Sequence, residues 1–287
     1  MDKINLKSPA KINLYLEVTG KRDDGYHNLE TVFQAIDLED KLSLELTKEK
    51  SIKVICRHPD VPLDSSNLTY RAANVLFNKL KIKTGLKIGL EKQISVAAGL
   101  GGGSSNAASV ILGLNSLLGL NLSKEEMLEM ASEVGADVPF FILEENCALG
   151  RGRGDELTVL NNVPEFWYVI VHPNIKISAS WAYQNFKLNL TKKKPGVKIF
   201  IRSLMGGNVE QIAPLLYNDL ENVIGASYSD VDYVKRVLMA KGIKAVLVSG
   251  SGPCVFGMVQ SKREAEIAKE QLDKHLLRAR TFVCHSR

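Results

Sequence analysis

Hydrophobic and polar residues alternate near the start of the chain with the period of a β-strand. Between Lys11 and Val18, apolar side chains occupy every second position and Asn13 falls among the polar ones. Because successive side chains of a strand point to opposite faces, this pattern predicts a strand with one buried face. Asn13 is then expected to point away from the apolar row.

The spacing of apolar residues also predicts the remaining strands and helices. Runs rich in β-formers indicate strands at 31–38, 42–46, 52–56, 86–90, 167–171, 245–248, 254–259 and 280–284. Apolar residues at helical spacing indicate helices at 67–80, 107–118, 178–186 and 230–241. Ser123 with Glu126, and Ser261 with Glu264, are capping pairs that begin two further helices, and the first of these is expected to end at Gly135 in a left-handed cap.

The order of these elements favours an α+β protein with two domains. Strands and helices alternate without a strict βαβ rhythm, and no fixed-period repeat is visible. The glycine-rich stretch 150–154 is a natural seam, so we expect an N-terminal domain at 1–155 and a C-terminal domain at 156–287. A chain of 287 residues is long enough for each domain to bury its own core.

Composition narrows the function classes. Apolar residues make up 45% of the chain and charged residues 24%, as in ordinary globular proteins. A net charge of +5 is too weak to indicate a nucleic-acid partner but is compatible with a small anionic ligand. The four cysteines lie far apart with no metal-binding spacing, which favours a reducing, cytoplasmic compartment. No apolar run is long enough to span a bilayer, so no membrane partner is expected, and the oligomeric state stays open.

The most unusual segment is a glycine-rich loop ahead of an apolar helix. Glycine lets the backbone approach an anion closely, and the free N–H groups at a helix start carry partial positive charge. The segment therefore predicts a phosphate site, although a tightly packed strand-to-helix turn is the alternative. It matches neither the Walker A loop nor the dinucleotide-binding fingerprint. Its residues are Ala97, Ala98, Gly99, Leu100, Gly101, Gly102, Gly103, Ser104 and Ser105.

Two charged residues stand in positions that allow more than one interpretation. Asp137 precedes a valine and a proline at a predicted helix start, where a carboxylate is either a plain N-cap or a fixed general base. From these residues alone, the N-cap is the simpler interpretation. Lys11 shares the polar side of its strand with Asn13, so the pair can face one cavity, whereas most strand lysines are solvated.

Taken in order, the short motifs of this chain resemble those of the GHMP kinase family, whose phosphate loop has the form Gly-Leu-Gly-Ser/Gly-Ser-Ser. The resemblance covers almost the whole chain and implies a two-domain α+β GHMP kinase fold with the active site in the cleft between the domains. Each motif alone is weak, and the ordered set is specific. The motifs are 9–14, 20–27, the glycine-rich loop, 135–141, 218–221 and 249–253.

The resemblance implies transfer of a phosphoryl group from ATP, with Mg²⁺, to a small alcohol that carries a cytidine diphosphate group. ATP would lie over 97–105, although the Mg²⁺ ligands cannot be named from the sequence. Asp137 would be the general base, with Lys11 beside it. Tyr26, His27 and Tyr183 would bind the cytidine group, and Asn13 would also bind this substrate. The loop 249–253 would approach this site from the C-terminal half.

Two residues depart from the family pattern, and two alternative functions remain open. Ser95 stands where the family often has proline, and Ala179 stands where threonine is common. The first alternative is another small-molecule kinase of the family, of the homoserine or mevalonate type. The second is a nucleotide-binding regulator that has lost catalysis, against which the presence of both Lys11 and Asp137 argues.

Overall fold

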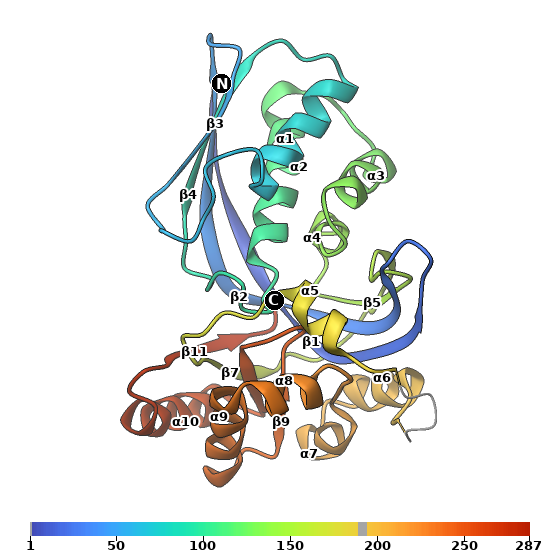
Figure 1. The fold of residues 1–287 in the computed structure, drawn as a ribbon, viewed down its shortest axis with the longest axis vertical. Helices are drawn as coiled ribbons and strands as arrows, with labels where there is room; N and C mark the ends of the chain where they lie inside the picture. The colour runs from blue at the N-terminus through green and yellow to red at the C-terminus, as the bar shows by residue number, and fades with distance from the viewer. Residues whose placement is uncertain (1, 189–193) are drawn as a thin grey trace. The chain divides into compact units, whose positions relative to one another are not determined.

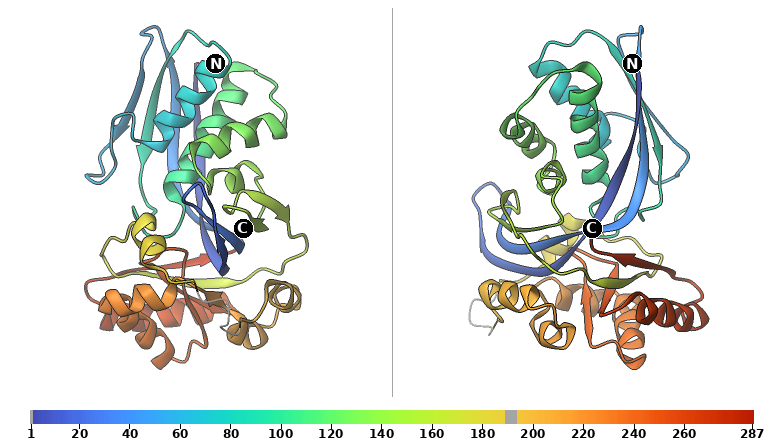
Figure 2. Two further views of the ribbon diagram at one scale, coloured as in Figure 1. Left: turned by 45° about the vertical axis from the view of Figure 1, so that its right-hand side comes forward. Right: turned by 180° about the vertical axis from the view of Figure 1, so that it is seen from behind.

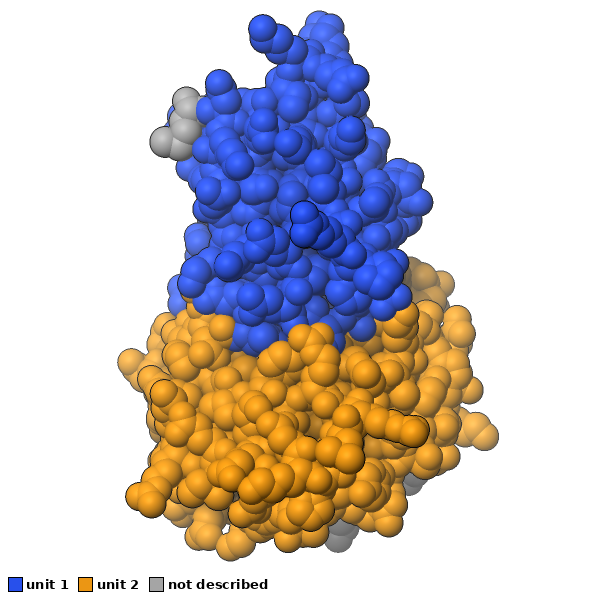
Figure 3. Space-filling model, turned by 90° about the vertical axis from the view of Figure 1, so that its left-hand side faces the viewer, with its two compact units in different colours: residues 1–10, 38–96, 101–145 blue, residues 11–37, 97–100, 146–287 orange. Residues whose placement is uncertain are grey.

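The computed structural model describes residues 2–188 and 194–287 (Figure 1). Contacts divide the chain into two compact units, coloured in Figure 3. The first comprises Met1–Ala10, Leu38–Val96 and Gly101–Glu145, and the second Lys11–Asp37, Ala97–Leu100 and Asn146–Arg287. These units interleave along the chain, unlike the consecutive domains 1–155 and 156–287. The division into an ATP-binding and a substrate-binding domain stays a prediction.

The first unit is a mixed sheet with helices on one face (Figures 1 and 2). The strands follow the order β3, β4, β2, β1, and β4 pairs parallel with β3 and antiparallel with β2. The elements are β1 (Lys3–Lys21), β2 (His27–Thr47), β3 (Ile52–Cys56), β4 (Gly85–Glu91), α1 (Leu68–Lys79), α2 (Gly102–Leu118), α3 (Lys124–Val134) and α4 (Val138–Ile142). Helix α2 packs closely against the sheet. A Cβ placed on Gly113 would stand 2.4 Å from Leu6 Cδ1 on β1 and 2.6 Å from Leu44 Cδ1 on β2.

The second unit holds the later part of β1 and the earlier part of β2, together with a second sheet. β5 (Cys147–Arg151) pairs with β2 and with β6 (Glu156–Val159), and β8 (Tyr217–Asn218) pairs parallel with β1. The second sheet has the order β11 (Arg280–His285), β7 (Trp167–His172), β10 (Val255–Val259), β9 (Ala245–Val248), with antiparallel pairing throughout. The helices are α5 (Ala179–Asn185), α6 (Val197–Met205), α7 (Val209–Ile212), α8 (Glu221–Ser227), α9 (Ser229–Ala240) and α10 (Lys262–His275).

A single apolar cluster joins the second sheet to its helices. Valines of β7, β9 and β10 pack against Leu238 of α9 and Leu272 of α10, both fully buried. Helices grouped against mixed and antiparallel sheets, rather than alternating with parallel strands, confirm the predicted α+β class. Within residues 2–188 and 194–287, no helix combines the length and apolar character needed to cross a bilayer.

Several local predictions are wrong for identifiable reasons. The runs 31–38 and 42–46 form one strand, β2, because the polar residues between them are accommodated within it. Strand β1 is buried on both faces between 10 and 16, so its polar row does not face solvent. Gly135 has a φ of 178°, which is extended backbone rather than a left-handed cap. The seam at 150–154 is the tip of the β5–β6 hairpin inside the second unit.

The polar interruption in β2 is a buried carboxylate with a full set of partners. Asp40 Oδ1 accepts the backbone N–H groups of Gln93 at 2.7 Å and Ile94 at 2.9 Å. Asp40 Oδ2 pairs with Lys92 Nζ and accepts Asn106 Nδ2 at 3.1 Å. Because its charge and lone pairs are satisfied, the carboxylate is tolerated in the middle of a strand. It fixes the segment that leads into the glycine-rich loop.

Replacing Asp40 by alanine should lower the free energy of unfolding by about 3–5 kcal/mol, since Lys92 would keep a buried charge without its counter-ion. Glu45→Ala on the same strand is the matched control, because Glu45 and its partner Lys87 are 41% and 45% exposed. That control should lose at most about 1 kcal/mol. Urea unfolding measures both variants, and equal losses would contradict a special role for the buried pair.

Candidate functional site

The polar side chains of β1 form a buried hydrogen-bonded group. Lys11 Nζ donates to Asn13 Oδ1 at 2.6 Å, and the two residues are 4% and 2% exposed. Asn13 Nδ2 donates to Thr31 Oγ1 at 2.8 Å, and Thr31 Oγ1 donates to the carbonyl of Tyr15 at 2.7 Å. The ammonium of Lys11 lies 5.4 Å from the centre of the Phe33 ring. The prediction that Lys11 and Asn13 share one side of the strand is therefore confirmed.

The loop 249–253 lies against this group and against 97–100, all within the second unit. Ser249 Oγ accepts the N–H of Asn13 at 3.3 Å and donates to the carbonyl of Gly99 at 3.0 Å. The N–H of Lys11 donates to the carbonyl of Leu100 at 3.0 Å. One serine hydroxyl therefore connects β1 to the first half of the glycine-rich loop.

The approach of these backbones is close enough to require glycine. Gly99 has a φ of +75°, and a Cβ there would stand 2.1 Å from the carbonyl oxygen of Ser249. Gly250 has a φ of +54°, and its Cβ would stand 3.0 Å from Asn13 Oδ1. Asn218 holds the loop from behind, since its Nδ2 donates to the carbonyls of Val248 and Gly250 at 2.8 Å each. Sequence reasoning gave Asn218 and Ser249 no roles, although both lie in the quoted motifs.

The second half of the glycine-rich loop is the start of helix α2, in the first unit. The helix follows Gly101, whose φ is +67°, and within the described ranges no side chain caps it. The first turn, 102–105, contains no acidic residue, so its free N–H groups keep their partial positive charge. Ser105 Oγ is buried and has no hydrogen-bond partner among the residues that the structure describes. These features suit a bound phosphate chain, and the phosphate site stays a prediction.

Asp137 occupies the N-cap position of helix α4 without acting as a cap. Within 2–188 and 194–287 its side chain makes no capping hydrogen bond. Pro139 in the first turn has no N–H group, which reduces the need for a cap. This half-buried carboxylate is therefore not the plain N-cap that was the simpler interpretation of the sequence. Asp137 belongs to the first unit and Lys11 to the second, and their expected proximity stays a prediction.

His27 and Tyr183, predicted as binding residues, stack on each other. Their ring centres lie 5.4 Å apart with planes inclined by 24°, and Phe186 packs edge-on to His27 at 6.5 Å. Burial, with a smaller contribution from Lys21, lowers the pKa of His27 from its ordinary value of 6.5. The imidazole is therefore neutral at pH 7, with one nitrogen that donates and one that accepts. Tyr183 also packs against the core of its unit.

Tyr26 lies apart from this stack, in the turn before β2. Its side chain is 52% exposed, and its N–H donates to Asp24 Oδ1 at 3.0 Å. The guanidinium of Arg153 lies 5.3 Å from the centre of the Tyr26 ring. Sequence reasoning missed Arg153, because it interpreted the glycine-rich stretch 150–154, in which Arg153 sits, as a seam between domains.

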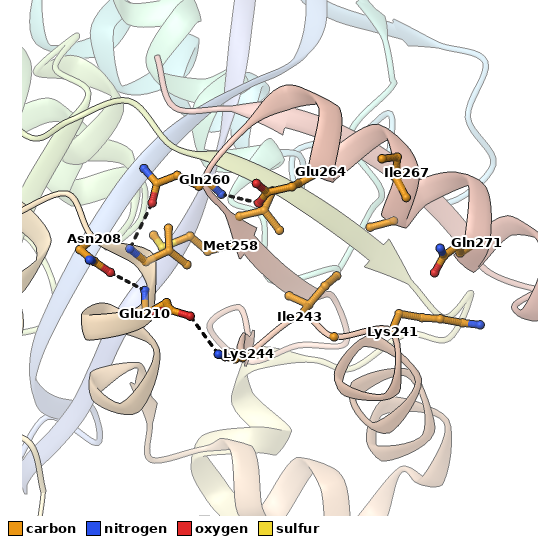
Figure 4. Close-up of a pocket in the computed structure, with 14 residues that line it drawn as sticks. Asn208, Glu210, Lys241, Ile243, Lys244, Met258, Gln260, Glu264, Ile267 and Gln271 are labelled. Carbon is orange, nitrogen blue, oxygen red and sulfur yellow. Dashed lines mark hydrogen bonds and ion pairs between the residues drawn. The ribbon is translucent and has the colours of Figure 1, made fainter.

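A cavity of about 560 Å³ lies elsewhere on the second unit, between α7, α10 and the end of β10 (Figure 4). None of the site residues predicted from the sequence lines it. Lys244 pairs with Glu210 at 2.9 Å, and Glu264 accepts the N–H of Gln260 at 3.1 Å. Because these rim groups bond to one another, the cavity offers no arrangement that suggests chemistry.

The described part of the chain contains no group of three or more His, Cys, Asp or Glu side chains that could hold a metal ion.

Of the two departures from the family pattern, Ser95 is buried with its hydroxyl unbonded, again counting only described residues. The loop entry beside it is nevertheless fixed, because Asp40 binds the two preceding N–H groups. Ala179 is the first residue of α5 and is exposed.

Comparison with protein families and curated sequences gives consistent matches. The family model described as GHMP kinases N terminal domain matches residues 67–145, and the one described as GHMP kinases C terminal matches 200–277. A protein from Geobacter sp. (strain M21) named 4-diphosphocytidyl-2-C-methyl-D-erythritol kinase is 43% identical over 274 residues, which are 96% of each chain. A protein of the same name from Clostridioides difficile (strain 630) is 42% identical, covering 96% of this chain and 93% of that one.

Solved structures agree with these matches. The crystal structure of 4-(cytidine 5'-diphospho)-2C-methyl-D-erythritol kinase aligns with a TM-score of 0.82 at 31% identity, covering 99% of this chain and all of that one. A homoserine kinase from Cytophaga hutchinsonii aligns with a TM-score of 0.79 at 20% identity over 100% of this chain and 95% of its own, which bears on the fold alone. From its family matches and its relatives over nearly the full length, the chain belongs to the GHMP kinase family.

Proposed function

We propose that this chain transfers the γ-phosphoryl group of ATP to the 2-hydroxyl of 4-diphosphocytidyl-2-C-methyl-D-erythritol. The products are ADP and the 2-phosphate, and the reaction belongs to non-mevalonate isoprenoid biosynthesis. The observation that carries the proposal is the 42–43% identity, over almost the whole length, to relatives named for this activity. The aromatic residues Tyr26, His27 and Tyr183 support it, because a pyrimidine base needs such flat apolar surfaces.

The phosphates of ATP lie over 97–105 in this proposal. Glycine at 99 lets the loop 249–253 pack against the first half of this segment, and the uncapped N-terminus of α2 contributes partial positive charge. The hydroxyl of Ser105, unbonded within the described residues, would supply one oxygen ligand to Mg²⁺ beside the phosphate oxygens. When bound, the ion neutralises negative charge on the transferred phosphoryl group.

Asp137 accepts the proton of the 2-hydroxyl in the proposed mechanism, and Lys11 stabilises the negative charge. The freed oxygen forms a bond to the γ-phosphorus while the bond between that phosphorus and the β–γ bridging oxygen breaks. The electron pair of that bond leaves with ADP. The carboxylate of Asp137 makes no capping hydrogen bond within the described residues, so the cap is not its role and it can accept a proton. Lys11 is fixed by Asn13, so its charge is positioned before substrate binds.

The cytidine end of the acceptor binds at the aromatic residues of the second unit. The neutral imidazole of His27 hydrogen-bonds the base edge, and the rings of Tyr26 and Tyr183 offer stacking surfaces. Asn13 contributes an amide on the substrate side of β1.

The four cysteines are free thiols, which suits the reducing cytoplasm, where we place this reaction.

A coupled assay of ADP release tests the substrate. Purified protein with MgATP should turn over 4-diphosphocytidyl-2-C-methyl-D-erythritol with a kcat/KM at least about tenfold above that for homoserine or mevalonate, since neither of these carries the cytidine group. Faster turnover of a cytidine-free alcohol would replace this proposal by another kinase of the family. Absence of ATP consumption with every acceptor would favour a nucleotide-binding regulator.

The variant Asp137→Asn should reduce kcat by about 10²- to 10⁴-fold with little change in either KM, because the amide cannot accept the proton. Glu133→Gln is the matched control. Glu133 is a 47% exposed carboxylate four residues earlier, in helix α3, and it pairs with Lys79. Steady-state kinetics compare the two variants with the wild type, and near wild-type kcat in Asp137→Asn would show that another group takes the proton.

A further inference from the structure

Arg153 covers one face of Tyr26, and the chain brings the two together from distant segments. Tyr26 ends the turn between β1 and β2, whereas Arg153 stands at the tip of the β5–β6 hairpin. The guanidinium carbon lies 5.3 Å from the ring centre, within the range of a cation–π contact. Both residues belong to the second unit.

Backbone hydrogen bonds fix the hairpin tip beside the start of β2. The N–H of Gly154 donates to the carbonyl of Arg151 at 2.9 Å and closes the turn. The carbonyl of Gly152 accepts the N–H of Leu29 at 2.7 Å. Leu29 is only two residues beyond His27, so the hairpin tip is tied to the segment that carries the aromatic residues.

Asp155 holds the side chain of Arg153 in one orientation. One carboxylate oxygen accepts the backbone N–H of Arg153 at 3.2 Å, and the other accepts Nε at 2.9 Å and also bonds Nη2. The side chains of Arg153 and Asp155 are 26% and 15% exposed. A guanidinium bonded along one edge to a carboxylate keeps its flat face free for an aromatic ring. Its charge is balanced by Asp155, so it is poorly suited to bind the diphosphate itself.

The turn holds the backbone of Tyr26, whose carbonyl accepts the N–H of Arg22 at 2.9 Å, but it gives the exposed ring little support. The tyrosine is 52% exposed, and the preceding Gly25 has a φ of +84°. A Cβ placed on Gly25 would have no atom of the described residues within 4 Å, so the turn is open on that side. An exposed ring in a turn loses rotational freedom when a base stacks on it, and that loss weakens binding. A ring already held on one face loses less.

We propose that Arg153, oriented by Asp155, is a positioning residue that fixes Tyr26 so that the opposite face of its ring receives the cytosine of the acceptor. The inference rests on the proposed function and assigns to the hairpin tip a part in substrate specificity. Arg153 acts through Tyr26 and takes no part in the phosphoryl transfer.

Kinetics of Arg153→Gln test the inference. The KM for the diphosphocytidyl acceptor should rise about two- to fivefold, with kcat and the KM for ATP unchanged, since an exposed cation–π contact has that strength. Arg153→Lys should fall between Arg153→Gln and the wild type. Arg151→Gln is the matched control, because Arg151 stands two residues away, is 44% exposed and pairs with Glu30. It should leave all three constants unchanged.

The same substitution in a Tyr26→Ala background separates positioning from a general structural role. If Arg153 acts through the tyrosine, Arg153→Gln should change the acceptor KM of Tyr26→Ala by less than about 1.5-fold. A rise of equal size in both backgrounds, or no rise in the wild-type background, overturns the inference while wild-type turnover still supports the function. Failure of the wild type to turn over the acceptor overturns both.

Discussion

The hydroxyl of Ser249 is the contact on which the arrangement of the proposed site depends. It accepts the N–H of Asn13 and donates to the carbonyl of Gly99, so one group joins strand β1, the loop 249–253 and the loop 97–100. The join works only because a glycine stands at 99, where any side chain would overlap the carbonyl of Ser249. Lys11, on the same strand, owes its position to this packing and to its bond with Asn13.

In both units, buried polar groups with complete sets of partners fix the backbone of neighbouring segments. In the first unit Asp40 fixes the residues before the glycine-rich loop, because it pairs with Lys92 and accepts the N–H groups of Gln93 and Ile94. In the second unit Asn218 anchors the loop 249–253 from behind. Because unpaired buried polar groups are costly, each of these networks favours one backbone conformation. The glycines, flexible as single residues, are thereby held in place by their surroundings.

Local patterns predicted much of this fold, and long-range contacts account for the rest. Helix α1 follows from the helical spacing of its apolar residues and strand β9 from its run of β-formers, and both predictions agree with the structure to within one residue. The continuity of β2 through Asp40 depends on partners more than fifty residues away, which no local pattern contains. Lys11 and Asn13 could be placed on one side of β1 from alternation alone. The pairing of Arg153 with Tyr26 could not, since it requires the hairpin to fold back onto the start of β2.

The affinity of the variant Gly99→Ala for ATP, measured by calorimetry, tests most directly whether this close packing shapes the phosphate loop. A Cβ at Gly99 would stand 2.1 Å from Ser249, so the two loops must separate. Gly119→Ala is the control, because Gly119 has a similar φ of +61° but its Cβ would meet no described atom within 4 Å. The account predicts a Kd for ATP raised by about tenfold or more in Gly99→Ala and unchanged in Gly119→Ala. Equal affinity in Gly99→Ala and the wild type would contradict it.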